Sequence, residues 1–360
     1  MSTSFKLLGK RVKLGETLDL RLPVSETFTG NELSLPIRVM RGKLAGPKLL
    51  VTAAVHGDEI NGTGIVHELL WARRPKLLRG TLVLIPVVDL FGFETQSRYM
   101  PDRRDLNRCF PGMLSGSLSS RFAAVLFEEI IKKVDYCLDL HSAATGRTNF
   151  PNVRADLGNK GCRLLAQSFG CELIVDGTGP EGSMRRAAVR AGVPTVILEA
   201  GEPSKIEPSV LEIGVRGVEN VLAGLGMTAG KPIAPPYQAR VKRTSWLRAA
   251  AGGLLRFHVS PGDLLEKGQP VSTNVSVLGE EQNMQVAPDD CIVLGMTTLP
   301  VVKPGEPIAH LAFPTRSLTS IRRALDTASK RNMHHRIRRD LATNMNITEA
   351  ASPDAESAST

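Results

Sequence analysis

The sequence predicts an α/β protein: a mostly parallel, twisted sheet with helices on both faces, followed by a small all-β domain. Two observations predict this class. Along the first two thirds of the chain, short apolar runs, which suit strands buried in a parallel sheet, alternate with helical patterns. Beyond residue 236, β-like segments separated by glycine turns replace the helical patterns.

The first 47 residues are predicted to be β-rich, because apolar residues recur at every second position in two stretches. These are Leu18, Leu20 and Leu22, and then Leu33, Leu35 and Ile37. We expect these N-terminal strands, residues 1–47, to pack on the domain that follows.

Residues 48–230 are predicted to form the sheet and its helices. The apolar runs are 49–55, 82–85, 136–140, 173–175 and 195–198, and the helical patterns are 60–71, 122–134, 162–169, 184–191 and 210–225. In open sheets of this kind ligands bind beyond the carboxyl ends of the strands. The residues that directly follow each run are therefore the candidates for a functional site, and the segments 147–156 and 177–186 are expected to be specificity loops.

A proline-rich linker, residues 230–236, separates a second module. Residues 236–315 contain two related segments with Pro-Gly-acid turns, which predict a small barrel or sandwich. Residues 316–360 predict a basic helix followed by a tail too polar to fold.

The composition excludes several classes of protein. Of the 360 residues 42% are hydrophobic and 22% are charged, which excludes wholesale disorder. No stretch approaches the ~18 apolar residues of a membrane span, and the start lacks the apolar core of a signal peptide. Five scattered cysteines without a C-x-x-C motif predict reduced thiols and a cytoplasmic location.

The net charge of +9 is concentrated in part between Arg316 and Arg339. Aromatic residues make up only 4% of the chain, and no nucleic-acid recognition motif accompanies the charge. A solvated basic surface is the favoured interpretation. We therefore expect neither a nucleic-acid nor a membrane partner.

Candidate metal ligands follow the apolar runs. His56-Gly-Asp-Glu59 follows the first run, and His141 follows the run at 136–140. Alone, a histidine at a strand end is more often a surface or capping residue. Together at one sheet edge, His56, Glu59 and His141 form a His₂Glu set, a zinc shell that leaves one coordination position open for catalysis. The sequence thus predicts one Zn²⁺ per chain.

Neighbouring acids have simpler interpretations. Asp58 is expected to cap the helix that follows it. Asp139, two residues before His141 and on the same strand face, is a candidate acceptor for its imidazole N–H. Cys109 has no histidine partner nearby in the sequence and is expected to be a packing residue.

Four motifs occur in a fixed order along the chain: His56–Glu59, Asp105-Leu-Asn-Arg-Cys-Phe-Pro-Gly112, Asp139-Leu-His141 and Leu198-Glu-Ala-Gly201. They resemble the succinylglutamate desuccinylase/aspartoacylase family, the deacylase branch of the zinc-carboxypeptidase-like metallohydrolases. The likeness covers roughly residues 20–315. It implies that zinc is held by the His₂Glu set and that Glu199 is the general base. It also implies that Arg98, Asn107 and Arg108 contact the substrate and the developing oxyanion.

Chemistry supports the role of Glu199 independently. A carboxylate must take the proton of a zinc-bound water and return it to the leaving nitrogen. Glu199 follows the run at 195–198 and so reaches the predicted edge, whereas its rivals Glu202, Asp102 and Asp105 lie in looser segments. An ordinary capping carboxylate is the alternative for Glu199.

The expected function is a zinc-dependent hydrolase that cleaves an acyl–amide or ester bond of a small N-acylated amino acid or amine. A zinc carboxypeptidase acting on peptides is one alternative, and a non-catalytic binding or scaffold protein is another. The second module resembles biotinyl/lipoyl domains, but no lysine occurs between Lys267 and Lys303 to carry a cofactor. We expect it to wall the active site or to mediate homo-oligomerisation.

Overall fold

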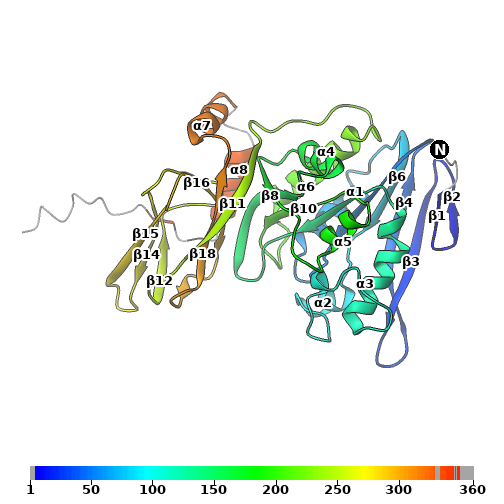
Figure 1. The fold of residues 1–360 in the computed structure, drawn as a ribbon, viewed down its shortest axis with the longest axis horizontal. Helices are drawn as coiled ribbons and strands as arrows, with labels where there is room; N and C mark the ends of the chain where they lie inside the picture. The colour runs from blue at the N-terminus through cyan, green and yellow to red at the C-terminus, as the bar shows by residue number, and fades with distance from the viewer. Residues whose placement is uncertain (1–4, 329–332, 344, 346, 349–360) are drawn as a thin grey trace, which may run out of the picture. The chain divides into compact units, whose positions relative to one another are not determined.

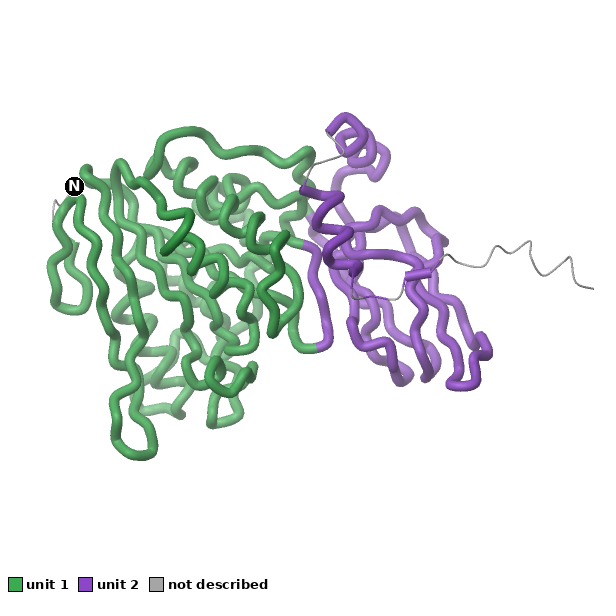
Figure 2. The backbone as a smooth tube through the Cα atoms, turned by 180° about the vertical axis from the view of Figure 1, so that it is seen from behind, with its two compact units in different colours: residues 1–145, 151–240 green, residues 146–150, 241–360 purple. Residues whose placement is uncertain are grey.

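The computed structural model describes residues 5–328, 333–343, 345, 347 and 348 (Figure 1). The chain divides into two compact units, shown in different colours in Figure 2. Unit 1 comprises residues 1–145 and 151–240, and unit 2 comprises residues 146–150 and 241–360. The tail predicted to be disordered, residues 351–360, lies outside the described residues.

Unit 1 is built on one large sheet. Its strands, in spatial order, are β9 (Leu173–Asp176), β8 (Arg147–Ala155, of which residues 147–150 belong to unit 2), β10 (Thr195–Gly201), β7 (Tyr136–His141), β5 (Leu44–Ala53), β6 (Arg79–Ile85), β4 (Glu32–Arg41) and β3 (Thr17–Glu26). The pairs β9–β8, β10–β7, β7–β5 and β5–β6 are parallel. The edge strands β4 and β3 pair antiparallel. A separate hairpin joins β1 (Phe5–Leu7) to β2 (Lys10–Val12).

The sheet of unit 1 carries helices, as the prediction of an α/β class requires. They are α1 (Asn61–Leu70), α2 (Leu90–Thr95), α3 (Leu118–Glu129), α4 (Lys160–Phe169), α5 (Met184–Arg190) and α6 (Pro208–Gly224), with short 3₁₀ turns at Leu106–Arg108 and Ile131–Lys133. The α/β class is therefore confirmed, with a sheet that is parallel in its middle and antiparallel at the β3 edge.

The core of unit 1 shows how the helices are held. Leu50 and Val83, from the β5–β6 pair, share an apolar cluster with Phe122 of α3 and Met184 of α5. On α1, a Cβ added to Gly62 would lie 2.8 Å from Leu140, so this helix packs closely on the sheet. The apolar runs of the sequence are thus buried between helices, which fixes where their ends point.

One segment expected to be a loop is a strand. Residues 147–156 were predicted to be a specificity loop, but β8 occupies Arg147–Ala155. The segment is polar, with buried Thr148, Asn149 and Asn152, and it contains Pro151. Sequences of this kind are rare in strands inside a sheet, which is why no strand was predicted here.

The described residues of unit 2 form two antiparallel sheets and two helices. The strands are β11 (Ala239–Arg248), β12 (Gly253–Phe257), β13 (Leu264–Leu265), β14 (Pro270–Val275), β15 (Glu281–Val286), β16 (Cys291–Thr297), β17 (Val301–Val302) and β18 (Pro307–Pro314). One sheet has the order β15-β14-β12-β17, and the other contains β13-β16-β18-β11. Phe257 and Val271 of the first sheet share a core with Val293 and Leu311 of the second.

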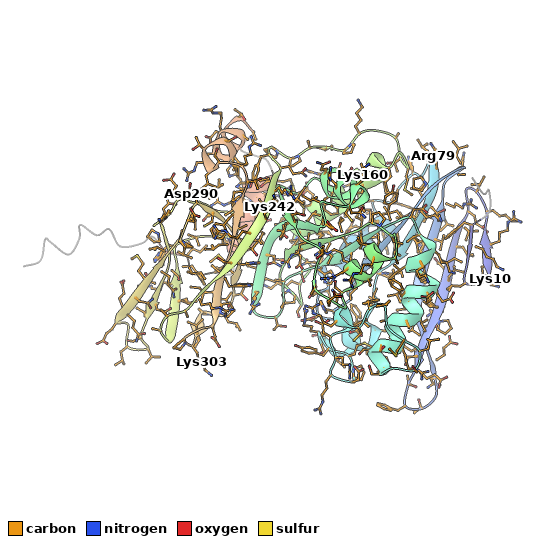
Figure 3. The ribbon with its side chains drawn as sticks, viewed as in Figure 1. Lys10, Arg79, Lys160, Lys242, Asp290 and Lys303 are labelled. Carbon is orange, nitrogen blue, oxygen red and sulfur yellow. The ribbon has the colours of Figure 1, made fainter. Side chains whose placement is uncertain are left out.

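In the part of the chain that the structure describes, two helices follow the strands of unit 2, where one basic helix was predicted. They are α7 (Leu318–Thr327) and α8 (Met333–Ala342). Across both units, basic side chains such as Lys10, Arg79, Lys160, Lys242 and Lys303 are exposed (Figure 3). No helix among the described residues has the length and apolar character needed to cross a membrane. All five cysteines carry free thiols.

Candidate metal centre

The turn between β5 and α1 brings His56 and Glu59 to one point. Just past the end of β5, Ala54 adopts a left-handed backbone conformation with φ of 49°, which turns the chain sharply. Gly57 then passes so close to α2 that an added Cβ would lie 1.8 Å from the Gly92 carbonyl carbon. Only glycine fits there. The glycine of the His-Gly-x-Glu sequence therefore allows this turn to pack against α2.

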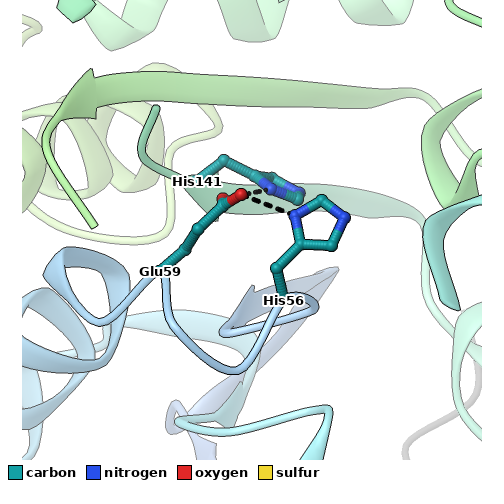
Figure 4. Close-up of side chains that lie close together, drawn as sticks. All are labelled: His56, Glu59 and His141. Carbon is teal, nitrogen blue, oxygen red and sulfur yellow. Dashed lines mark hydrogen bonds and ion pairs between the residues drawn. The ribbon is translucent and has the colours of Figure 1, made fainter. Parts of the chain in front are cut away.

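The three predicted ligands lie together (Figure 4). His56 Nδ1 is 2.6 Å from Glu59 Oε1, and His141 Nδ1 is 2.8 Å from Glu59 Oε2. Their candidate donor atoms all lie within 4.8 Å of one another, and each residue is at most 4% exposed. Among the residues that the structure describes, this is the one group of histidine, cysteine and acidic side chains arranged to hold a metal ion.

A second carboxylate stands behind each imidazole. His56 Nε2 is 3.0 Å from Asp105 Oδ1, and His141 Nε2 is 2.8 Å from Asp139 Oδ2. Carboxylates in this position fix the ring orientation of metal-binding histidines and increase their basicity. Each ring therefore turns its Nδ1 toward Glu59. Asp139 has the contact predicted for it.

The imidazoles and carboxylates of the cluster shift one another's pKa values. Burial lowers the pKa of His141, but the carboxylates of Asp139 and Glu59 outweigh it and hold that pKa well above its usual value. Burial acts to raise the pKa of Glu59, but the two imidazoles hold it below its usual value. The donors thus attract positive charge, and two imidazole nitrogens with one carboxylate oxygen are the donor set that suits zinc.

Glu199 lies beside the cluster on the neighbouring strand. In the parallel pair β10–β7 it stands in register with His141, so the two side chains project from the same face of the sheet. Its side chain is 15% exposed, and Arg154 Nε lies 3.6 Å from its Oε1. The acid is therefore near the ligands and only partly open to solvent.

The rival carboxylates are engaged elsewhere. Glu202 pairs with Lys205, Asp102 accepts hydrogen bonds from Ser119, and Asp105 contacts His56 and Arg98. Asp58 does not cap α1, which begins without a side-chain cap; instead Asp58 accepts a hydrogen bond from Thr145 Oγ1.

The three other predicted site residues differ in their placement. Arg98 reaches the cluster, with Nη1 3.0 Å from Glu59 Oε1 and Nη2 2.9 Å from Asp105 Oδ2. Asn107 is buried, and its Oδ1 accepts a hydrogen bond from the backbone N–H of Met184 at the start of α5. Arg108 is exposed and donates to the Asn107 carbonyl oxygen. The structure thus brings Arg98 to the ligands and shows no contact of Asn107 or Arg108 with them.

Comparison with known proteins decides the family. The model of the succinylglutamate desuccinylase/aspartoacylase catalytic domain matches residues 45–225, half of the chain. The chain belongs to this family. The matched region contains the three clustered residues His56, Glu59 and His141, together with Arg98 and Glu199.

Known proteins resemble this chain over most of its length. The N-alpha-acetyl-L-2,4-diaminobutyric acid deacetylase of Halomonas elongata is 27% identical over 267 residues, which are 70% of this chain and 78% of that protein. A succinylglutamate desuccinylase/aspartoacylase from Rhodobacter sphaeroides has a TM-score of 0.72 at 24% identity, covering 83% of this chain and 96% of its own. The ectoine utilization protein EutE (DoeB) from Ruegeria pomeroyi has a TM-score of 0.72 at 22% identity, over 82% and 95%.

The comparisons support one conclusion about the fold and one about the activity. The two solved structures show that the fold is shared. Family membership and the curated relative make the protein a hydrolytic deacylase.

The sequence covered Arg185 only within the expected specificity segment 177–186 and gave it no role of its own. In the structure Arg185 lies in α5, which begins inside that segment at Met184, and it is close enough to Glu199 to interact with its charge. Arg185 is 5% exposed, and its Nε and Nη1 have no hydrogen-bond partner. Burial and the nearby Arg154 lower its pKa to about 10, although Glu199 acts in the opposite direction. A buried guanidinium with free donors is rare. In the sequence it is one of two adjacent arginines at the start of a helix, and nothing local marks it as buried.

Proposed function

We propose that the protein is a zinc-dependent deacylase that hydrolyses the acyl–amide or ester bond of a small N-acylated amino acid or amine. The observation that carries the proposal is the convergence of two imidazoles on one buried carboxylate, with a second carboxylate in register on the next strand. We also propose that the sheet has the complete strand and helix arrangement of the zinc carboxypeptidases. The free thiols further support the proposal of a cytoplasmic location.

His56, Glu59 and His141 would hold one zinc ion, and the buried, preorganised donor set supports this assignment. When bound, zinc supplies an activated water with a pKa of ~7 and polarises the scissile carbonyl. Asp105 and Asp139 keep both rings oriented through their outer nitrogens.

Glu199 is proposed to move the proton. Its carboxylate takes a proton from the attacking water and then donates it to the leaving nitrogen, a role that typically contributes ~10²–10⁴-fold. Arg154 is placed to hold this carboxylate in position. Arg98 is proposed to offer its guanidinium to the oxyanion that develops on the carbonyl oxygen.

The substrate is proposed to carry a carboxylate. Two guanidinium nitrogens of Arg185, Nε and Nη1, are buried without a partner, and such donors favour an anion that accepts hydrogen bonds from both. Asn107 and Arg108 are proposed as further substrate contacts. The named substrate of the Halomonas relative is an N-acetylated amino acid, which belongs to this chemical class.

Replacement of Glu199 tests the mechanism. Glu199→Gln keeps the size of the side chain but cannot take a proton, so kcat is expected to fall by at least about 100-fold while zinc content stays at the wild-type level. Initial rates on a panel of N-acyl amino acids, with short peptides alongside, measure this.

Two results would contradict the proposal. Hydrolysis by the Glu199→Gln variant at the wild-type rate would exclude Glu199 as the general base. Wild-type activity on peptides alone would favour a carboxypeptidase instead.

A further inference from the structure

Arg98 contacts two of the atoms proposed to bind the metal. Its Nη1 lies 3.0 Å from Glu59 Oε1 and 3.2 Å from His56 Nδ1. A guanidinium has only hydrogen-bond donors, so it interacts with the same oxygen and nitrogen lone pairs to which a metal ion binds. A positive side chain is therefore built into the immediate surroundings of the proposed cation.

Arg98 is also held in this place. Its Nη2 lies 2.9 Å from Asp105 Oδ2, and the other oxygen of that carboxylate faces His56 Nε2. The side chain of Arg98 is 25% exposed and that of Asp105 is 14% exposed. Because solvent screens a partly buried pair poorly, the guanidinium cannot be treated as a distant surface charge.

We infer that Arg98 lowers the affinity of the His56–Glu59–His141 cluster for its metal ion, an inference that rests on the proposed metal site. The guanidinium competes for Glu59 Oε1 and repels a divalent cation across a short distance. The same positive charge serves the reaction by stabilising the oxyanion. Arg98 thus increases the rate of the reaction and decreases the affinity for the metal ion.

The two halves of the Arg98–Asp105 ion pair are expected to act in opposite directions. Loss of Arg98 removes a competitor and a like charge. Loss of the Asp105 charge removes the acceptor behind His56 and leaves the guanidinium less compensated. Asp105→Asn is therefore expected to weaken metal binding, although Arg98→Met strengthens it.

The test is zinc affinity, measured by competition with a chromophoric chelator in the full chain. Arg98→Met is expected to bind zinc on the order of tenfold more tightly than wild type, the lower end of the effect that residues behind a metal ligand have on affinity. Arg98→Lys keeps the charge and is expected to stay near wild type. Arg104→Met removes an exposed arginine six positions after Arg98 and is expected to leave zinc affinity unchanged.

The outcomes separate this inference from the proposed function. Equal or weaker zinc binding by Arg98→Met, or tighter binding by Arg104→Met, overturns the inference alone. A wild-type protein that binds no zinc overturns the proposed function and the inference with it. Arg98→Gln, also neutral, repeats the measurement if thermal melting shows that the methionine variant is misfolded.

Discussion

Glu59 is the residue through which the cluster is joined. Its Oε1 faces His56 and its Oε2 faces His141, and the backbone N–H of Ser142 donates to Oε2 at 3.1 Å. Burial of a carboxylate that is only 2% exposed would destabilise the folded protein without such partners. The cluster therefore depends on residues from the turn after β5 and from the end of β7, which have to meet with little freedom.

Asp139 is expected to determine how well His141 binds metal. In Asp139→Asn the neutral amide no longer increases the basicity of the ring, so zinc affinity should fall about 10–100-fold in a chelator competition. Thr52→Val is the control, because it removes one hydrogen bond to Asp139 and keeps the charge. Equal losses in the two variants would mean that packing, rather than the carboxylate, holds the ring.

At the residue scale, the clustering of His56, Glu59 and His141 could be predicted because His56–Glu59 and His141 each follow a buried strand. The contact of Asp105 with His56 could not, because it joins a loop residue to a turn 49 positions away and no periodicity links them. For the same reason Asp105 was considered only as a rival base, whereas the structure shows that it orients His56 and Arg98.

At the element scale, the turn after β5 depends on its contact with α2. The apolar run 49–55 predicted a strand that ends just before His56, and β5 ends two residues earlier, at Ala53. The six-residue helix α2 was not predicted, since a single short turn gives no helical period. Yet α2 forms the surface on which Gly57 sits.

Gly57→Ala tests this contact. The added methyl would overlap the backbone at Gly92, so the turn has to move and both His56 and Glu59 move with it. We expect a loss of about 1–3 kcal/mol in the free energy of unfolding together with weaker zinc binding. Urea unfolding and a chelator competition measure the two effects.

Gly177→Ala is the matched control, because no atom lies within 4 Å of a Cβ built at Gly177. Equal stability and zinc affinity in Gly57→Ala and wild type would contradict the packing argument.

At the scale of the whole molecule, all seven predicted site residues lie in unit 1. The α/β class of this unit could be predicted because its apolar runs and helical patterns alternate. The assignment of residues 146–150 to unit 2 could not, because it rests on the antiparallel pairing of Asn149 with Gly295, and a contact between such distant residues leaves no local pattern.

The most direct test of the account is the zinc content of the purified protein. Elemental analysis is expected to find one zinc per chain in wild type and almost none in His56→Ala and His141→Ala, because each substitution removes one of three ligands. Wild type without zinc, or near-full zinc occupancy in both histidine variants, would contradict the account.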